Sequence, residues 1–242
     1  DKISIPKLDE TYNKPNPRKI SNALFDQPSG INDKTGLSDF TWVFAQFIDH
    51  DINLQEYDET QTLTNIIVPE DDQFFPPNTI IKTQRCKIAE GTGTSELNPA
   101  RYKNKVTAFI DLSTIYGSDS IRATWLRTFQ NGKLKVSQGN MLPWNTSDGE
   151  FNSPVDDFAP KMVDETNSLL KYFVAGDKRA NENPLLIGLH TLFVREHNRI
   201  CETLLNMNYK GDGWMQIEWA MPKGADIVQS YQHNLHFLRS MI

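Results

Sequence analysis

Residues 38–52 read SDFTWVFAQFIDHDI, and this stretch decides the fold because the predicted structured part of the chain begins with it. Apolar side chains recur at the spacing of one helix face: Phe40, Val43, Phe44, Phe47 and Ile48. Ser38 stands just before them, and serine suits the capping position of a helix. The stretch therefore predicts an amphipathic helix over residues 38–55.

The polar residues of this helix gather near its end. Gln46 and His50 lie four residues apart and so share one face. Asp49 and Asp51 flank the histidine. Spacing alone leaves two interpretations open: these residues mark the polar end of the helix, or they perform general acid–base catalysis or bind a metal.

A second segment, residues 107–113, reads TAFIDLS and places oxygen atoms at alternate positions. Thr107, Asp111 and Ser113 offer side-chain oxygens, and Phe109 can offer its carbonyl. In an extended loop such oxygens can converge on one cation, and hard oxygen ligands favour calcium. Asp51 is a candidate for a further carboxylate ligand. An ordinary amphipathic strand with a polar face is the other interpretation.

A third segment, residues 175–184, reads AGDKRANENP and leads into a long apolar pattern. Arg179 could present a fixed positive charge to an oxyanion. Glu182 stands where a carboxylate is favoured at a helix start, which is its alternative interpretation. Pro184 suits the first turn of a helix. A long helix over 184–207 is predicted from its apolar residues: Leu185, Leu189, Leu192, Phe193, Ile200, Leu204 and Leu205.

The rest of the chain predicts few regular elements. Stretches rich in Pro, Gly, Asn or Asp predict loops over residues 56–105 and 130–160. Residues 1–37 predict an extended arm or a partly disordered segment. Short strands are possible at 66–68 and 79–82, and residues 106–116 allow a strand or an extended loop. A helix is expected from Ser118 or Asp119 to about Thr128. The predicted fold class is mainly α, with long loops and few short strands.

Composition narrows the classes of function. The chain has 242 residues and a net charge of −6, which argues against an electrostatic grip on nucleic acid or on an anionic membrane. No apolar stretch reaches the roughly 18 to 20 residues of a membrane-spanning helix. Two cysteines, Cys86 and Cys201, allow at most one disulfide bond.

Together these segments resemble the animal-type haem peroxidases of the peroxidase–cyclooxygenase superfamily, which includes myeloperoxidase and peroxidasin. The match runs from about residue 17 to 207. Its motifs stand in the family's order: Gln46 to Asp51, Thr107 to Ser113 with Tyr116-Gly117-Ser118, Gly176-Asp177-Lys178-Arg179 with Glu182, Leu189-His190-Thr191, and Arg195-Glu196-His197-Asn198-Arg199. Several motifs in one order are far more specific than any one of them.

The resemblance implies a role for each matching residue on the distal side of a haem b group. His50 matches the distal acid–base histidine, Arg179 the distal arginine and Gln46 the distal glutamine. Asp49 and Glu182 match carboxylates that form ester bonds to haem methyl groups in mammalian members, and ester bonds here are a hypothesis.

The resemblance also implies a calcium site and one missing bond. Asp51, Thr107, Phe109, Asp111 and Ser113 match the family's Ca²⁺ ligands. Asn183 stands where myeloperoxidase has a methionine bonded to the haem, so that bond is expected to be absent. His190 and His197 are interpreted as structural residues of the long helix.

The sequence departs from the family pattern after about Met207. The family's axial iron ligand is a histidine in an Asn-Ala-Phe-Arg-x-Gly-His type of motif, which does not occur here. We therefore expect a partial, myeloperoxidase-like fold in three parts: an N-terminal arm (1–37), the distal half of a haem peroxidase domain (38–207) and a divergent tail (208–242). A second chain or a missing C-terminal half is expected to supply the proximal histidine, with His233 and His236 as substitute candidates.

The implied function is an oxidoreductase that reduces H₂O₂ and oxidises a small donor: a halide, thiocyanate, a phenol or another organic molecule. A secreted, extracellular or periplasmic location and a role in the response to oxidative stress follow from the same resemblance. The alternative is a catalytically inactive domain that binds calcium or haem and serves as an interaction module.

Overall fold

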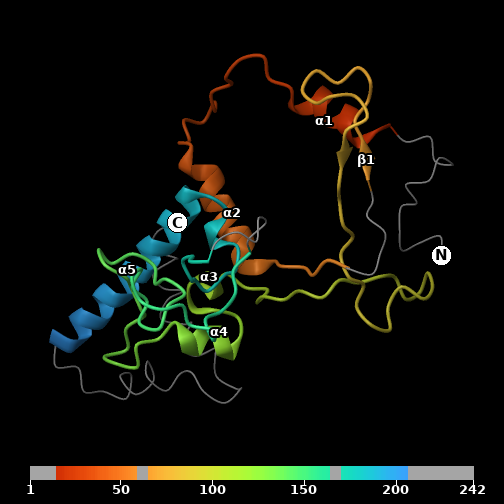
Figure 1. Ribbon diagram of the computed structural model, residues 1–242. Coiled ribbons are helices and arrows are strands. Elements are labelled where there is room, and N and C mark those ends of the chain that lie inside the picture. The colour runs from red at the N-terminus through yellow and green to blue at the C-terminus, as the bar shows by residue number, and fades with distance from the viewer. Residues whose placement is uncertain (1–14, 59–64, 164–169, 207–242) are drawn as a thin grey trace. The chain divides into compact units, whose positions relative to one another are not determined.

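The computed structural model describes residues 15–58, 65–163 and 170–206, and its elements fall into two units (Figure 1). One unit comprises the residues up to Gly36 together with Leu54–Lys105, and the other comprises Leu37–Asn53 and the residues from Val106 onward. The predicted boundaries at 37 and 207 stay predictions, and residues 208–242 lie outside the described residues.

The residues of the first unit that the structure describes form one helix and a two-stranded sheet. Helix α1 (Pro17–Phe25) begins at Asn16, whose side chain accepts a hydrogen bond from the Arg18 N–H. Strands β1 (Ile66–Ile67) and β2 (Ile80–Ile81) pair antiparallel, with Ile66 opposite Ile81. The Asn16 side chain donates to the carbonyl of Ile67, which ties the start of α1 to β1.

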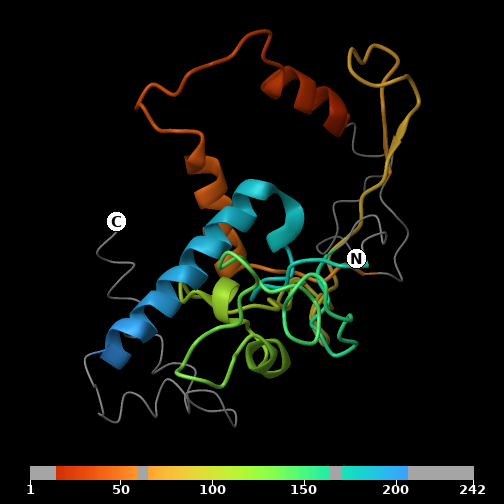
Figure 2. The same ribbon diagram turned by 60° about the vertical axis from the view of Figure 1, so that its left-hand side comes forward.

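The described part of the second unit contains four α-helices and a short 3₁₀ helix. These are α2 (Phe40–Ile52), α3 (Ser113–Tyr116), α4 (Ser120–Trp125), the 3₁₀ helix Ala180–Glu182 and α5 (Pro184–Asn206). Helix α5 packs against α2 and α3, and Figure 2 shows α2 and α5 crossing from a second side. Among the described residues, no helix is long and apolar enough to cross a membrane.

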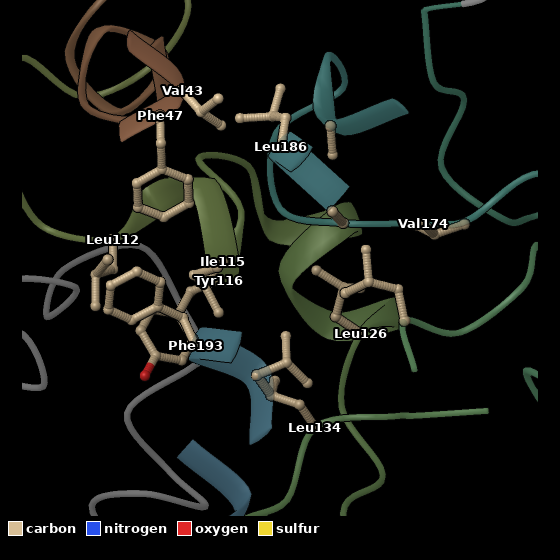
Figure 3. Close-up of a cluster of buried hydrophobic side chains, with 14 residues drawn as sticks. Val43, Phe47, Leu112, Ile115, Tyr116, Leu126, Leu134, Val174, Leu186 and Phe193 are labelled. Atoms are coloured by element: carbon tan, nitrogen blue, oxygen red, sulfur yellow. The ribbon is translucent and has the colours of Figure 1, made fainter. Parts of the chain in front are cut away.

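The core of this unit lies where α2, α3 and α5 meet. Phe47 of α2 stacks on Phe193 of α5, with ring centroids 5.1 Å apart. Figure 3 shows further apolar side chains gathered around them: Val43, Leu112, Ile115, Tyr116, Leu126, Leu134, Val174 and Leu186. Burial of this apolar surface holds the three helices together and fixes which face of α2 points inward.

The structure confirms the mainly α class and both long helices, with adjusted ends. Helix α2 begins at Phe40 rather than Ser38, and it ends at Ile52 rather than 55 because Asn53 turns extended and its N–H bonds the Asp49 carbonyl. Helix α5 spans Pro184–Asn206, close to the predicted 184–207. The two short strands were also expected, and each is shorter than predicted.

The structure corrects three sequence predictions in part. Residues 1–37 were expected to be irregular, yet Pro17–Phe25 is helical because Asn16 caps it and proline suits its first turn. Residues 106–116 were expected to be strand or extended loop, but Ser113–Tyr116 forms α3, which begins after Leu112 in a left-handed conformation. The helix expected to reach Thr128 ends at Trp125.

Candidate active site

His50 is the centre of the site and faces away from solvent. The residue is 5% exposed, its Nε2 lies 3.8 Å from Glu182 Oε2 and its Nδ1 lies 3.9 Å from Asp177 Oδ1. Burial lowers the pKa of His50, and the positive charge of Arg179 adds to this, while the Asp177 and Asp49 carboxylates oppose it. His50 is therefore a neutral imidazole at pH 7.

Gln46 and Glu182 form the more exposed side of the site. Gln46 Nε2 donates to Glu182 Oε2 at 2.9 Å, and Asn183 Nδ2 donates to Gln46 Oε1 at 3.0 Å. The Asn183 side chain also accepts from the Leu186 N–H, so it caps α5. Asn183 was noted in the sequence only for its lack of a thioether, and its bridging role between α2 and α5 was missed.

Arg179 is anchored at the C-terminal end of α2. Its Nη2 donates to the His50 carbonyl at 3.0 Å and its Nη1 donates to the Asn53 carbonyl at 2.9 Å. The last carbonyls of a helix lack partners within the helix, and a positive charge is favourable there. The guanidinium thus lies beside His50 and holds the end of α2 that carries it.

Asp177 is the functional residue that the sequence did not assign. It is 3% exposed, and its carboxylate accepts from Arg179 Nε at 2.9 Å and from Nη2 at 2.7 Å. Burial acts to raise the pKa of Asp177, but the hydrogen bonds and charge of Arg179 outweigh burial and hold this pKa below its ordinary value. The Asp-x-Arg spacing in 177–179 was the available signal.

Asp49 takes no part in this network of hydrogen bonds. It is exposed on α2, and its carboxylate acts on His50 through charge. The structure thus brings His50, Gln46, Arg179 and Glu182 together and leaves Asp49 at the edge. His233 and His236 lie outside the described residues.

A cluster of oxygen atoms lies around Asp51, the residue that follows His50 on α2. Thr107 Oγ1 has four oxygen neighbours: Asp111 Oδ1 at 2.9 Å, the Asp51 carbonyl at 3.3 Å, Ser113 Oγ at 3.3 Å and the Phe109 carbonyl at 3.4 Å. One hydroxyl carries one proton, so it can donate to one of these oxygens only. The structure therefore brings all the predicted calcium ligands together.

The two carboxylates of this cluster, Asp51 and Asp111, are buried. Burial raises the pKa of Asp51 and of Asp111, and the charge of Asp51 raises that of Asp111 further. The Asp51 carboxylate accepts from the backbone N–H groups of Asp111, Leu112 and Thr114. In the described ranges, no group of three or more His, Cys, Asp or Glu side chains is placed to hold a metal ion, and this cluster contributes two carboxylates.

His197 lies away from the site, and both of its ring nitrogens have hydrogen-bond partners. Its Nε2 donates to the Gly132 carbonyl at 2.9 Å, and its Nδ1 accepts from the Tyr116 hydroxyl at 3.0 Å. Burial lowers the pKa of His197 to about 4. The folded chain therefore holds this ring neutral at a pH where an unfolded chain would protonate it.

Replacement of His197 by glutamine is expected to reduce the loss of stability in acid. A depressed histidine pKa gives stability that is complete above pH 6.5 and is lost as the pH falls toward about 4, at about 1.4 kcal/mol for each pH unit. Urea unfolding at pH 7, 6 and 5 measures this slope. The slope of the variant should be smaller by about that amount, and equal slopes would show that His197 does not titrate in this way.

Comparison with known proteins gives the family. The model of the animal haem peroxidases matches residues 1–214. A peroxidasin homologue of Caenorhabditis briggsae is 31% identical over 86% of this chain and 18% of its own length. Peroxinectin A of Dictyostelium discoideum is 27% identical over 81% of this chain and 37% of its own length.

A solved structure agrees with these relatives. Peroxidase A from Dictyostelium discoideum superimposes with a TM-score of 0.67 at 25% identity, over 86% of this chain and 41% of that one. The chain thus spans less than half of the length of the proteins that it matches.

Proposed function

Because the chain belongs to the animal haem peroxidase family, we propose that it takes part in haem-dependent reduction of H₂O₂ coupled to oxidation of a small donor. The observation that carries this proposal is His50, a buried neutral imidazole whose Nε2 faces the partly exposed Glu182 and its partner Gln46. We place the donor among halides, thiocyanate, phenols and other small organic molecules, and the site of action outside the cytoplasm.

The residues present fit a haem group on the Gln46 and Glu182 side of His50. A neutral imidazole is needed there as a base, and the structure keeps His50 neutral by burial. Glu182 and Asp49 are exposed carboxylates within reach of the same end of α2, and they would hold the group by ester bonds. Bound haem would supply the iron that exchanges electrons with peroxide and donor.

The chain's own residues would move one proton and stabilise one charge. His50 Nε2 takes a proton from the peroxide oxygen nearest to it and returns it to the departing oxygen, so the same atom acts as base and then as acid. Arg179 contributes a fixed positive charge beside His50, which favours the developing negative oxygen. The Gln46 amide would position water or a small anion.

We further propose that the oxygen cluster binds Ca²⁺ through Asp51, Thr107, Phe109, Asp111 and Ser113. The proposal is supported by the oxygen atoms gathered around Thr107 Oγ1 and by two buried carboxylates that accept hydrogen bonds from neutral N–H and O–H groups. Oxygens that ligate one Ca²⁺ at about 2.3–2.6 Å lie roughly 3 Å or more apart, as these do. Asp51 precedes the end of α2, so calcium would fix His50 beside it.

Replacement of Asp111 by alanine is expected to weaken Ca²⁺ binding on the order of 100-fold, because one of two charged ligands is lost. Calorimetric titration with Ca²⁺ measures the affinity, and the rise of Tm on adding Ca²⁺ should shrink in the variant. Asp157→Ala, which removes an exposed carboxylate of the same charge, is the matched control. Equal Ca²⁺ affinity in the two variants would remove Asp111 from the site.

The proposed function is tested by titrating the purified 242-residue chain with haem and recording absorption spectra before and after H₂O₂ is added. Stoichiometric haem uptake with a Soret band that shifts on adding peroxide is the expected result. Ca²⁺-dependent folding without saturable haem uptake would overturn the proposal and indicate an inactive calcium-binding module.

A further inference from the structure

His190 of α5 is fully buried, and only one of its two ring nitrogens is paired. Its Nδ1 lies 2.8 Å from the Leu186 carbonyl, which can only accept, so Nδ1 carries the proton. Burial lowers the pKa of His190 to about 4, and the ring is neutral at pH 7. Its Nε2 is therefore a bare lone pair, and it has no hydrogen-bond partner.

His50 also has a buried ring nitrogen that lacks a hydrogen-bond partner. The Nδ1 atom of His50 is buried and has no hydrogen-bond partner. Its neighbour Asp177 Oδ1 lies 3.9 Å away, too far for a direct hydrogen bond. Two buried ring nitrogens without partners are costly, because each loses its bond to water without replacement.

Both histidines are linked to the same residues of the second unit. Phe47, three residues before His50 on α2, contacts the His190 ring edge-on with centroids 5.1 Å apart. The charges of Asp177 and Arg179 act on both histidines, and the charge of His50 acts on His190. The Asp177–Arg179 pair thus acts on both rings, one on α2 and the other on α5.

We propose that His190 is a positioning residue for His50. One buried water molecule accepts the Nδ1–H of His50 and donates its two protons to His190 Nε2 and to the Asp177 carboxylate. Every donor and acceptor in this arrangement is then used: one ring N–H, one lone pair, one carboxylate and both water protons. Buried waters commonly make about three such bonds to groups that otherwise lack partners.

This arrangement selects one tautomer of His50. With its proton held on Nδ1, the lone pair of His50 stands on Nε2, the atom that faces Glu182. The other tautomer would leave two lone pairs, on His50 Nδ1 and His190 Nε2, facing the same water. The consequence for peroxide chemistry rests on the proposed function, whereas the tautomer itself does not require haem.

Two substitutions of His190 separate positioning from packing. His190→Asn keeps a donor for the Leu186 carbonyl and removes the acceptor at the Nε2 position. His190→Gln places an amide oxygen near the Nε2 position and so keeps that acceptor. Ring ¹⁵N NMR of the haem-free chain distinguishes a protonated ring nitrogen from a bare one, and amide spectra show whether each variant is folded.

The expected result is a protonated Nδ1 and a bare Nε2 on His50 in the unchanged chain, loss of this single form in His190→Asn, and its recovery in His190→Gln. A proton on Nε2 of His50 in the unchanged chain overturns the proposal even if a variant does not fold. An unaltered His50 signal in a folded His190→Asn variant overturns it as well. In the haem-loaded chain, the rate with H₂O₂ should fall in His190→Asn and recover in His190→Gln, while failure to load haem would count against the proposed function and leave the tautomer result standing.

Discussion

Replacement of His50 by alanine is expected to slow the reaction of the haem-loaded chain with H₂O₂ by about 10²–10⁴-fold, the usual contribution of one general acid–base group. The structure gives the reason: the imidazole is neutral, it is held by the core on one edge, and its Nε2 faces the polar side of the site. Alanine offers no atom that can take a proton from peroxide.

Stopped-flow absorption after mixing with H₂O₂ measures this rate, and haem titration shows whether the variant still binds the cofactor. The matched control is His197→Gln, which changes another enclosed histidine of the same unit that lies outside the site. The control should retain its rate within a few-fold. If His50→Ala binds haem and keeps the unchanged rate, His50 is not the acid–base residue.

The sequence predicted those parts of the fold that rest on local periodicity. Helix α5 is long and apolar on one face, so its bounds came out within a residue of the described end. Helix α1 was missed because its apolar pattern, Ile20, Ala23 and Leu24, covers only nine residues within a stretch of scattered Pro, Asn, Gly and Lys. Helix α3 was missed because its start depends on a distant residue. The Asp51 carboxylate, about sixty residues earlier in the chain, accepts hydrogen bonds from the N–H groups of Asp111 and Leu112, just before the helix begins.

The sequence predicted those site residues that residue type and local spacing identify. It did not predict residues whose role depends on contacts with distant parts of the chain. Gln46 and His50 share a helix face by spacing alone, and alternate oxygens in 107–113 converge as expected. Asp177 was not assigned, because its role depends on Arg179 and on the fold that brings both to the end of α2. His190 likewise read as an ordinary core histidine until its partnerless Nε2 was visible.

Gly176 packs against the backbone of α3 and directly precedes Asp177 of the site. Its replacement by alanine is expected to destabilise the second unit by about 3 kcal/mol or more, a larger loss than ordinary overpacking causes. A Cβ atom at this position would lie 2.5 Å from the Thr114 carbonyl oxygen and from the Ile115 carbonyl carbon, and 2.6 Å from the Gly117 nitrogen. All three are backbone atoms and cannot rotate away. The Thr114 oxygen also accepts from the Asp177 N–H at 2.9 Å, so a shift breaks this bond and moves Asp177.

Gly188→Ala provides a control of opposite sign on the same chain. Gly188 lies within α5, and a Cβ there would meet nothing within 4 Å. Alanine is the better helix former, so this variant should gain about 0.5–1 kcal/mol. Urea unfolding of both variants measures the two shifts. Hydrogen bonds fix the backbone on both sides of Gly176: Arg122 donates to the Ala175 carbonyl at 2.8 Å, and the Asp177 N–H donates to the Thr114 carbonyl. If Gly176→Ala is as stable as the unchanged chain, α3 and residues 175–177 are not packed against each other as described.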